Sequence, residues 1–246
     1  MPGDAPLSKQ ERARSYGSAV VLSEIMQGVN REVTAAELAT SLAAEHGFTL
    51  LHPFEDPDVI AGQGSCGVEL CEQCLERGVV QEGAGRLHAL LVPTGGGGLA
   101  AGCALAMRAP QFFPGAAVYA VEPEGYDDHA LSLAKGERVG LVGNPPSLCD
   151  SLQAVSPGAN TFPINARLLA GALVVGDEEV RHAMRVAFEM LQIVLEPGGA
   201  AGLAAVLAGK LPGGSIRGKT ICIIASGGNL NLEKFARVLG CPNSKM

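Results

Sequence analysis

The feature that most constrains this chain is a run of four glycines, Gly95, Gly96, Gly97 and Gly98. An apolar segment at 87–92 precedes this tetraglycine loop and an alanine-rich segment follows it, so the pattern predicts strand, loop and helix. Without a Cβ, successive N–H groups can turn toward one ligand, and the next helix adds its positive dipole end. We interpret the loop as an anion site, with phosphate as the natural ligand. The alternative is a turn selected for tight packing, although one or two glycines would satisfy a turn.

Composition narrows the class of protein. The chain has 246 residues, 47% of them hydrophobic, which is enough for one large domain or two smaller ones. Gly, Pro or charged residues interrupt the longest apolar runs, so we expect no membrane span. The N-terminus lacks a basic segment followed by an apolar one, so we expect no export and a cytoplasmic protein. A net charge of -7 with 18 scattered Lys and Arg argues against nucleic acid and favours small ligands.

The seven cysteines are an odd number spread along the chain, which indicates reduced thiols rather than a disulfide framework. Cys71 and Cys74 form a lone C-x-x-C inside a helical pattern. Because no second pair follows at zinc spacing, we expect these two thiols and Cys66 to be packed in the interior, not metal ligands or a redox pair.

Helical and strand patterns alternate along the chain. The expected helices include one capped by Asp4 and ending near Tyr16, one over 34–46, a short one opening at Asp56, a separate one over 62–78, one capped by Asp177, and one over 197–210. The expected strands are 19–22, 48–51, 87–92, 116–121, 173–175 and 220–224, and the proline-rich stretch 136–169 is expected to form loops and short helices. This alternation predicts an α/β fold with a mostly parallel sheet and flanking helices.

Several separated motifs occur together in a fixed order. They are the segment 1–6, the segment 52–64, the tetraglycine loop, Glu122-Pro123 with Asp127-Asp128, Glu196-Pro197, and the segment 226–229. In this order they resemble the fold-type II pyridoxal-phosphate (PLP) enzymes, in particular the serine racemases and the serine/threonine and threo-3-hydroxyaspartate ammonia-lyases. Six motifs in the right order are far more specific than any single glycine-rich loop.

The resemblance implies a tryptophan-synthase-β-like PLP fold that is N-terminally incomplete. Residues 1–54 would be the remainder of its small domain and residues 55–246 its large PLP-binding domain. The activity implied is PLP-dependent dehydration or racemisation of L-serine, L-threonine or hydroxyaspartate, by a homodimer when complete.

The resemblance also assigns site residues. Gly95, Gly96, Gly97 and Gly98 would hold the cofactor phosphate, and the neutral hydroxyl of Ser226 would face the pyridine nitrogen. Glu122, the carbonyl of Tyr126 and Asp128 would form an oxygen-only site for Mg²⁺ or Ca²⁺. Without the resemblance, Glu122 and Asp128 would be interpreted as solvated loop carboxylates.

One part of the family pattern is missing. The Schiff-base lysine of the family lies in a Ser-x-Lys-x-Arg-Gly segment upstream of the motif that here begins at residue 1, and none of the six lysines has that context. We therefore expect no catalytic residue of this kind in the chain. Both a truncated gene product and a non-catalytic relative would explain this.

Two other functions compete with the PLP assignment. Gly95-x-Gly97-x-x-Ala100, with Glu122 ending the next strand, also fits a nicotinamide-binding Rossmann oxidoreductase. That interpretation leaves the segment 226–229 without a role. The other alternative is a non-enzymatic binder of a phosphate-bearing ligand.

Overall fold

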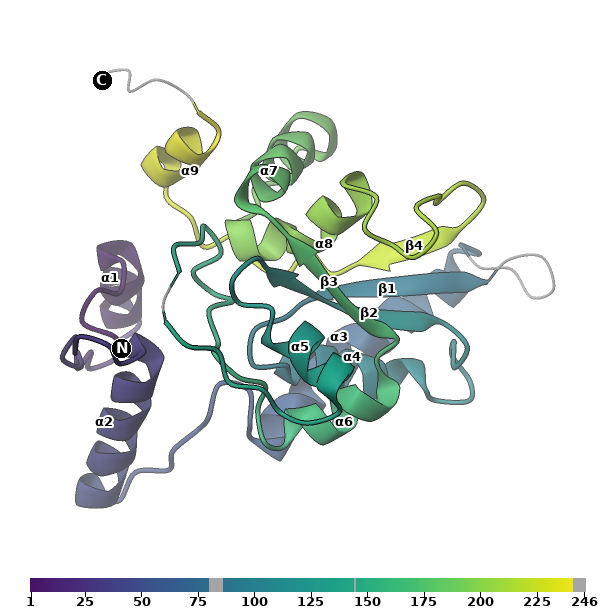
Figure 1. The fold of residues 1–246 in the computed structure, drawn as a ribbon. Helices are drawn as coiled ribbons and strands as arrows, with labels where there is room; N and C mark the ends of the chain where they lie inside the picture. The colour runs from purple at the N-terminus through teal and green to yellow at the C-terminus, as the bar shows by residue number, and fades with distance from the viewer. Residues whose placement is uncertain (80–85, 144, 241–246) are drawn as a thin grey trace. The chain divides into compact units, whose positions relative to one another are not determined.

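The computed structural model describes residues 1–79, 86–143 and 145–240 (Figure 1). The chain divides into two compact units, Met1–His52 with Val142–Pro145, and Pro53–Leu141 with Pro146–Met246. Within the described residues, no helix is both long enough and apolar enough to cross a bilayer.

The first unit contains two helices, α1 (Leu7–Ser15) and α2 (Arg31–His46). The side chain of Asn30 accepts a hydrogen bond from Glu32 N–H at 2.8 Å, so α2 begins before the predicted Thr34. The helix ends at residue 46 as predicted, and Gly47 caps it at φ +69°. The predicted cap at Asp4 is wrong, because α1 begins after Pro6 and Asp4 instead pairs with Arg31 at 3.2 Å.

The predicted strands 19–22 and 48–51 are also wrong. A strand needs a neighbour for its backbone groups, and among the described residues of this unit only an isolated bridge joins Pro2 to Ser23. Apolar side chains in both segments stay exposed, 47% for Val21 and 70% for Leu51. The local pattern predicted strands, but the described residues of the unit supply no ladder of hydrogen bonds beyond that single bridge.

The second unit is built on a parallel sheet in the order β3-β2-β1-β4. Its strands are β1 (Leu87–Pro93), β2 (Ala117–Pro123), β3 (Gly171–Val175) and β4 (Thr220–Ile223). Its helices are α3 (Pro57–Glu76), α4 (Gly98–Met107), α5 (Asp128–Lys135), α6 (Thr161–Leu168), α7 (Asp177–Leu191), α8 (Pro197–Leu207) and α9 (Leu232–Val238). The α/β class with a parallel sheet and flanking helices is confirmed.

Helices cover both faces of this sheet. Leu91 of the central strand β1 packs in one apolar cluster with residues of α7 and α8, and its neighbour Leu90 packs in a second cluster with residues of α3 and α4 (Figure 1). Both side chains are fully buried. Successive residues of a strand point to opposite faces, so β1 is buried on both sides, as a central parallel strand requires. By contrast, every residue of β4 is only half-buried.

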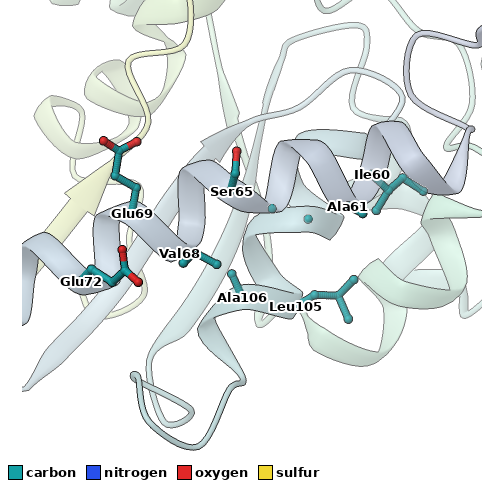
Figure 2. A pocket seen from close by; sticks show the side chains of 10 residues that line it. Ile60, Ala61, Ser65, Val68, Glu69, Glu72, Leu105 and Ala106 are labelled. Carbon is teal, nitrogen blue, oxygen red and sulfur yellow. The ribbon is translucent and has the colours of Figure 1, made fainter.

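Helix α3 is continuous, so the two helices predicted within it are one. Its glycines allow α4 to approach, since a Cβ on Gly67 would lie 2.9 Å from Ala106 Cβ and one on Gly64 would lie 3.1 Å from Gly102 O. An open groove of about 820 Å³ lies between these helices. Figure 2 shows the side chains that line it. Apolar side chains line most of it, and Glu69 and Glu72 are its charged members.

Two other details depart from the sequence prediction. Gly176, not Asp177, is the N-cap of α7, and Asp177 accepts a hydrogen bond from Leu148 N–H at 3.0 Å. The apolar side chains along α7 are buried only in its first part: Val180, Met184 and Ala187 are buried, whereas Phe188 and Leu191 remain 44% and 55% exposed. Of the three thiols expected to be packed, Cys71 and Cys74 are buried, whereas Cys66 is only half-buried. Burial raises the pKa of Cys71 to about 11.

Candidate functional site

The tetraglycine loop lies where β1 ends and α4 begins. Thr94 N–H donates to Val121 O at 2.8 Å, which fixes the exit of β1 against β2. Gly97 has φ +96°, a left-handed conformation that favours glycine, and α4 starts at the next residue. The loop therefore occupies the carboxyl edge of the parallel sheet, where α/β proteins bind ligands.

Three donors from the segment around α6 hold the loop carbonyls. Gly96 O accepts hydrogen bonds from Gly158 N–H at 3.1 Å and from Thr161 Oγ1 at 2.6 Å, and Gly97 O accepts one from Asn165 Nδ2 at 3.2 Å. Thr161 and Asn165 lie four residues apart, on one face of α6, and both are fully buried. The carbonyls of the loop are thus fixed by a part of the chain that is distant in sequence.

The N–H groups of the loop have no such partners. Among the residues that the structure describes, none of the N–H groups of residues 95–98 donates to a protein acceptor. Gly96, Gly97 and Gly98 are buried, and buried backbone donors are almost always paired. Unpaired donors at a helix N-terminus are what a phosphate group would satisfy, so these residues fit the phosphate of PLP.

The loop also has no room for side chains. A Cβ on Gly97 would lie 2.6 Å from both Asn165 Nδ2 and His129 Nε2, and one on Gly96 would collide with the ring of Phe54. Sequence reasoning singled out the glycines but missed Phe54, Thr161 and Asn165 as the groups that shape them. The spacing of four residues between Thr161 and Asn165, which places both on one face of a helix, is the sequence feature that could have pointed to them.

Ser226 follows β4 at the same edge of the sheet and is exposed. Its loop rests on the start of α8: Gly227 O accepts a hydrogen bond from Glu196 N–H at 2.9 Å, and a Cβ on Gly199 would lie 2.7 Å from Gly227 N. The structure leaves the Ser226 hydroxyl accessible to a ligand. Its contact with the pyridine ring stays a prediction.

The predicted metal ligands Glu122 and Asp128 are brought together, and they are 0% and 1% exposed. They are therefore not solvated loop carboxylates. Glu122 Oε1 and Oε2 accept hydrogen bonds from the N–H groups of His129 and Ala130 at 2.7 and 2.9 Å. His129, which the sequence analysis missed, places Nδ1 3.4 Å from Glu122 Oε1 and 3.4 Å from Asp128 Oδ2.

Burial and mutual charge shift the pKa of all three groups. Burial raises the pKa of Glu122 and of Asp128 despite the neighbouring imidazole. Burial alone would lower the pKa of His129, but the two carboxylates, each 3.4 Å from Nδ1, favour the charged imidazole more strongly and raise that pKa to about 9. The three buried side chains therefore influence one another's ionisation in a site that is shielded from solvent.

The donor set fits a bound cation. Both oxygens of Asp128 and Nδ1 of His129 are buried without a hydrogen-bond partner. Of the described His, Cys, Asp and Glu side chains, Glu122, Asp128 and His129 form the group that could share an ion. Tyr126 lies in the turn between β2 and α5, where its N–H donates to Pro123 O at 3.0 Å. Ligation by its carbonyl stays a prediction.

Three of the described lysines are paired with carboxylates. Lys135 contacts Glu137 at 2.7 Å, Lys210 contacts Glu179 at 2.9 Å, and Lys234 contacts Asp150 at 3.3 Å. Lys245 lies outside the described residues. The pairings leave none of these three lysines with the free amine that a Schiff base needs.

Comparisons with known proteins agree with this geometry. Residues 1–227 match the family described as pyridoxal-phosphate dependent enzyme. The L-threo-3-hydroxyaspartate ammonia-lyase of Pseudomonas sp is 37% identical over 97% of this chain and 68% of its own length. The serine racemase of Rattus norvegicus is 33% identical over 97% of this chain and 66% of its own length.

Solved structures show the same fold. The T.th. threonine deaminase superposes with a TM-score of 0.82 at 40% identity, over 94% of this chain and 69% of that one. Maize serine racemase gives 0.81 at 32% identity, over 97% and 68%. The chain thus spans about two thirds of these relatives, and none of these matches supports the Rossmann alternative. The matched residues and the shared fold show that this chain belongs to the PLP-dependent enzyme family, in its fold-type II branch.

Proposed function

We propose that this chain forms the phosphate-binding part of a PLP-dependent enzyme that deaminates or racemises a small hydroxy amino acid. The observation that carries the proposal is the tetraglycine loop, whose N–H groups have no acceptor among the described residues while its carbonyls are held by Gly158, Thr161 and Asn165. The names of the relatives, which include L-threo-3-hydroxyaspartate ammonia-lyase, serine racemase and L-threonine dehydratase, support the substrate class.

Different residues of this chain would contact different parts of the cofactor. The N–H groups of residues 95–98 would bind the phosphate, and Phe54 would pack against the loop and limit access of water to it. Ser226 would place a neutral hydroxyl near the ring nitrogen, which leaves that nitrogen without a proton. PLP, when bound, supplies an electron sink that stabilises negative charge at the α-carbon of the substrate.

The resemblance carries three further proposals. A divalent cation would bind at Glu122 and Asp128, where two buried carboxylates need compensating charge. We also propose homodimer assembly, on the resemblance alone, and a cytoplasmic location, on the composition alone.

The 246-residue chain should bind PLP without turnover. An exposed lysine amine, with an ordinary pKa of ~10.4, is mostly protonated at neutral pH and reacts slowly. Borohydride reduction followed by mass spectrometry should therefore show no single lysine labelled to completion, and serine and threonine should yield no pyruvate or 2-oxobutyrate. One lysine fully labelled together with keto-acid formation would show that this chain carries its own Schiff-base residue.

A fusion tests the activity itself. The part of the Pseudomonas ammonia-lyase that bears the Schiff-base lysine would be joined before residue 1 of this chain, with the unfused chain as the control. We expect the fusion to form keto acid from a hydroxy amino acid and to be labelled at that one lysine. A folded fusion that takes up PLP at that lysine but neither deaminates nor racemises serine, threonine or hydroxyaspartate would contradict the proposed function.

A further inference from the structure

Three consecutive side chains at the entry of α3 contact three different parts of the second unit. The ring of Phe54 lies against the tetraglycine loop, where a Cβ on Gly96 would collide with it. Glu55 Oε2 accepts a hydrogen bond from Asn160 N–H at 2.8 Å. The side chain of Asp56 caps α3. The middle residue, Glu55, therefore connects the entry of α3 to the N-terminus of α6.

Two hydrogen bonds join Glu55 and Asn160, which are 105 residues apart in sequence. Besides the bond to the carboxylate, Asn160 Nδ2 donates to Glu55 O at 2.8 Å. Asn160 is the N-cap of α6, and its side chain turns back to Glu55 instead of capping the helix. The carboxylate of Glu55 supplies an acceptor at this helix N-terminus and interacts favourably with the positive end of the helix dipole. The first turn of α6 is therefore fixed from outside the helix.

The same turn of the chain holds the tetraglycine loop. Gly158 N–H and Thr161 Oγ1 both donate to Gly96 O, at 3.1 and 2.6 Å. The carboxylate of Glu55 lies directly on Gly158, because a Cβ at that position would collide with it. Asn160 lies between the two donors in sequence. Fixing its N–H therefore restrains both donors and, through them, the carbonyl of Gly96.

The carbonyl of Gly96 and the N–H of Gly97 belong to one peptide unit. Because that unit is planar and trans, its C=O and N–H bonds point in opposite directions and can only turn together. A carbonyl held toward α6 thus directs the N–H of Gly97 away from α6. This N–H is one of the buried donors that the proposed function assigns to the phosphate.

We propose that Glu55 is a positioning residue for the phosphate-binding loop. Its carboxylate fixes the first turn of α6, which holds the carbonyl of Gly96 and so orients the N–H of Gly97 for the phosphate. The inference rests on the proposed function and adds to it a residue that acts through α6. It also gives a role to the segment 52–64 beyond the contact of Phe54.

Three substitutions at Glu55 separate the position of the acceptor from its charge. Glu55→Gln keeps an oxygen at the same reach without the charge, Glu55→Asp keeps the charge on a shorter side chain, and Glu55→Ala removes both. Asp56→Ala is the matched control, because it removes the cap of α3 and leaves the bonds between Glu55 and α6 in place. Each variant of the whole chain is titrated by calorimetry with PLP and with pyridoxal, which lacks the phosphate. Chemical denaturation measures its free energy of unfolding.

Glu55→Ala and Glu55→Asp should weaken PLP binding by roughly three- to fivefold, the effect of about one hydrogen bond, and leave pyridoxal affinity unchanged. Glu55→Gln should keep the preference of the wild-type chain for PLP over pyridoxal. Asp56→Ala should lower the free energy of unfolding and also keep that preference. A residue with a structural role alone would not distinguish the two ligands.

An unchanged preference for PLP in Glu55→Ala and Glu55→Asp, or an equal loss of preference in Asp56→Ala, would overturn the inference and leave the proposed function intact. A loss in Glu55→Gln as large as that in Glu55→Ala would also overturn it, because charge and not the position of the acceptor would then be responsible. If Glu55→Ala does not fold, Glu55→Asp decides. Equal affinities of the wild-type chain for PLP and pyridoxal would instead contradict the proposed function, and the inference with it.

Discussion

The two glycine-containing loops at the carboxyl edge of the sheet are organised to different degrees. The tetraglycine loop follows the doubly buried strand β1, and donors from Gly158, Thr161 and Asn165 hold its carbonyls. The loop that carries Ser226 follows the half-buried strand β4, and the serine itself is exposed. The chain thus organises the phosphate end of the expected cofactor site in advance and leaves the ring end accessible.

This difference suggests where binding energy would come from. Backbone donors that are already oriented lose little entropy when a ligand arrives, whereas an exposed hydroxyl has to be ordered by the ligand. We therefore expect changes in the tetraglycine loop to affect affinity for PLP more than changes in the Ser226 loop. Substitutions in and around the two loops test this expectation.

The largest effect is expected from Gly97→Ala. Its backbone conformation alone would cost about 1–2 kcal/mol, and the new Cβ would lie 2.6 Å from buried Asn165 and His129. Calorimetry should show at least roughly a tenfold loss of PLP affinity, or about 1.4 kcal/mol. Gly136→Ala, at φ +78° with open space around it, measures the strain without the collision and should leave affinity unchanged.

The matched change in the other loop is Gly227→Ala. The three atoms nearest its Cβ would all belong to the flexible Glu196 side chain, not to backbone, so we expect a loss of stability below about 1 kcal/mol. If chemical denaturation and PLP titration gave equal losses for Gly97→Ala and Gly227→Ala, the contrast between the loops would be lost.

An intermediate effect is expected from Thr161→Val. The substitution removes the hydroxyl that donates to Gly96 O at 2.6 Å and leaves the bond from Gly158 N–H in place. Loss of a buried hydrogen bond should lower the free energy of unfolding by about 1–3 kcal/mol. PLP affinity should fall by roughly five- to tenfold as the loop loosens. An unchanged affinity in a destabilised variant would show that the α6 contacts serve stability alone.

The smallest effect is expected from Ser226→Ala. Because the side chain is exposed, the melting temperature should not change. Loss of one neutral hydrogen bond to the ring should weaken PLP binding by about threefold, within the usual range of about 0.5–1.5 kcal/mol. A loss of PLP affinity larger than that of Gly97→Ala would show that the Ser226 loop, and not the tetraglycine loop, contributes more to PLP binding.

Local patterns predicted the parts of the site that are local in sequence. The strand, glycines and helix around Gly97 form one continuous segment, so periodicity and glycine content were enough to place them. Thr161 donates to a carbonyl 65 residues away, and it lies in the proline-rich stretch where the pattern indicated only loops and short helices. Contacts of that range depend on tertiary packing, which periodicity does not report.

Two other differences between prediction and structure have different causes: His129 was missed, and the strands predicted in the N-terminal unit do not form. The family motif directed attention to the oxygen ligands Glu122 and Asp128, so the adjacent histidine drew no interpretation. The apolar segments 19–22 and 48–51 have strand composition, but a strand forms only with a pairing partner, and the described part of their unit offers only a single bridge. Strand propensity alone could not show that these segments lack a strand to pair with.

The most direct test of the account is the phosphate dependence of cofactor binding. The wild-type chain is titrated by calorimetry with PLP and with pyridoxal, which has the same ring without the phosphate, and the PLP titration is repeated in inorganic phosphate. We predict one PLP per chain, bound roughly tenfold or more tighter than pyridoxal and displaced by phosphate, because the free N–H groups of the tetraglycine loop recognise the phosphate. Equal affinities for PLP and pyridoxal, or no competition by phosphate, would contradict the account.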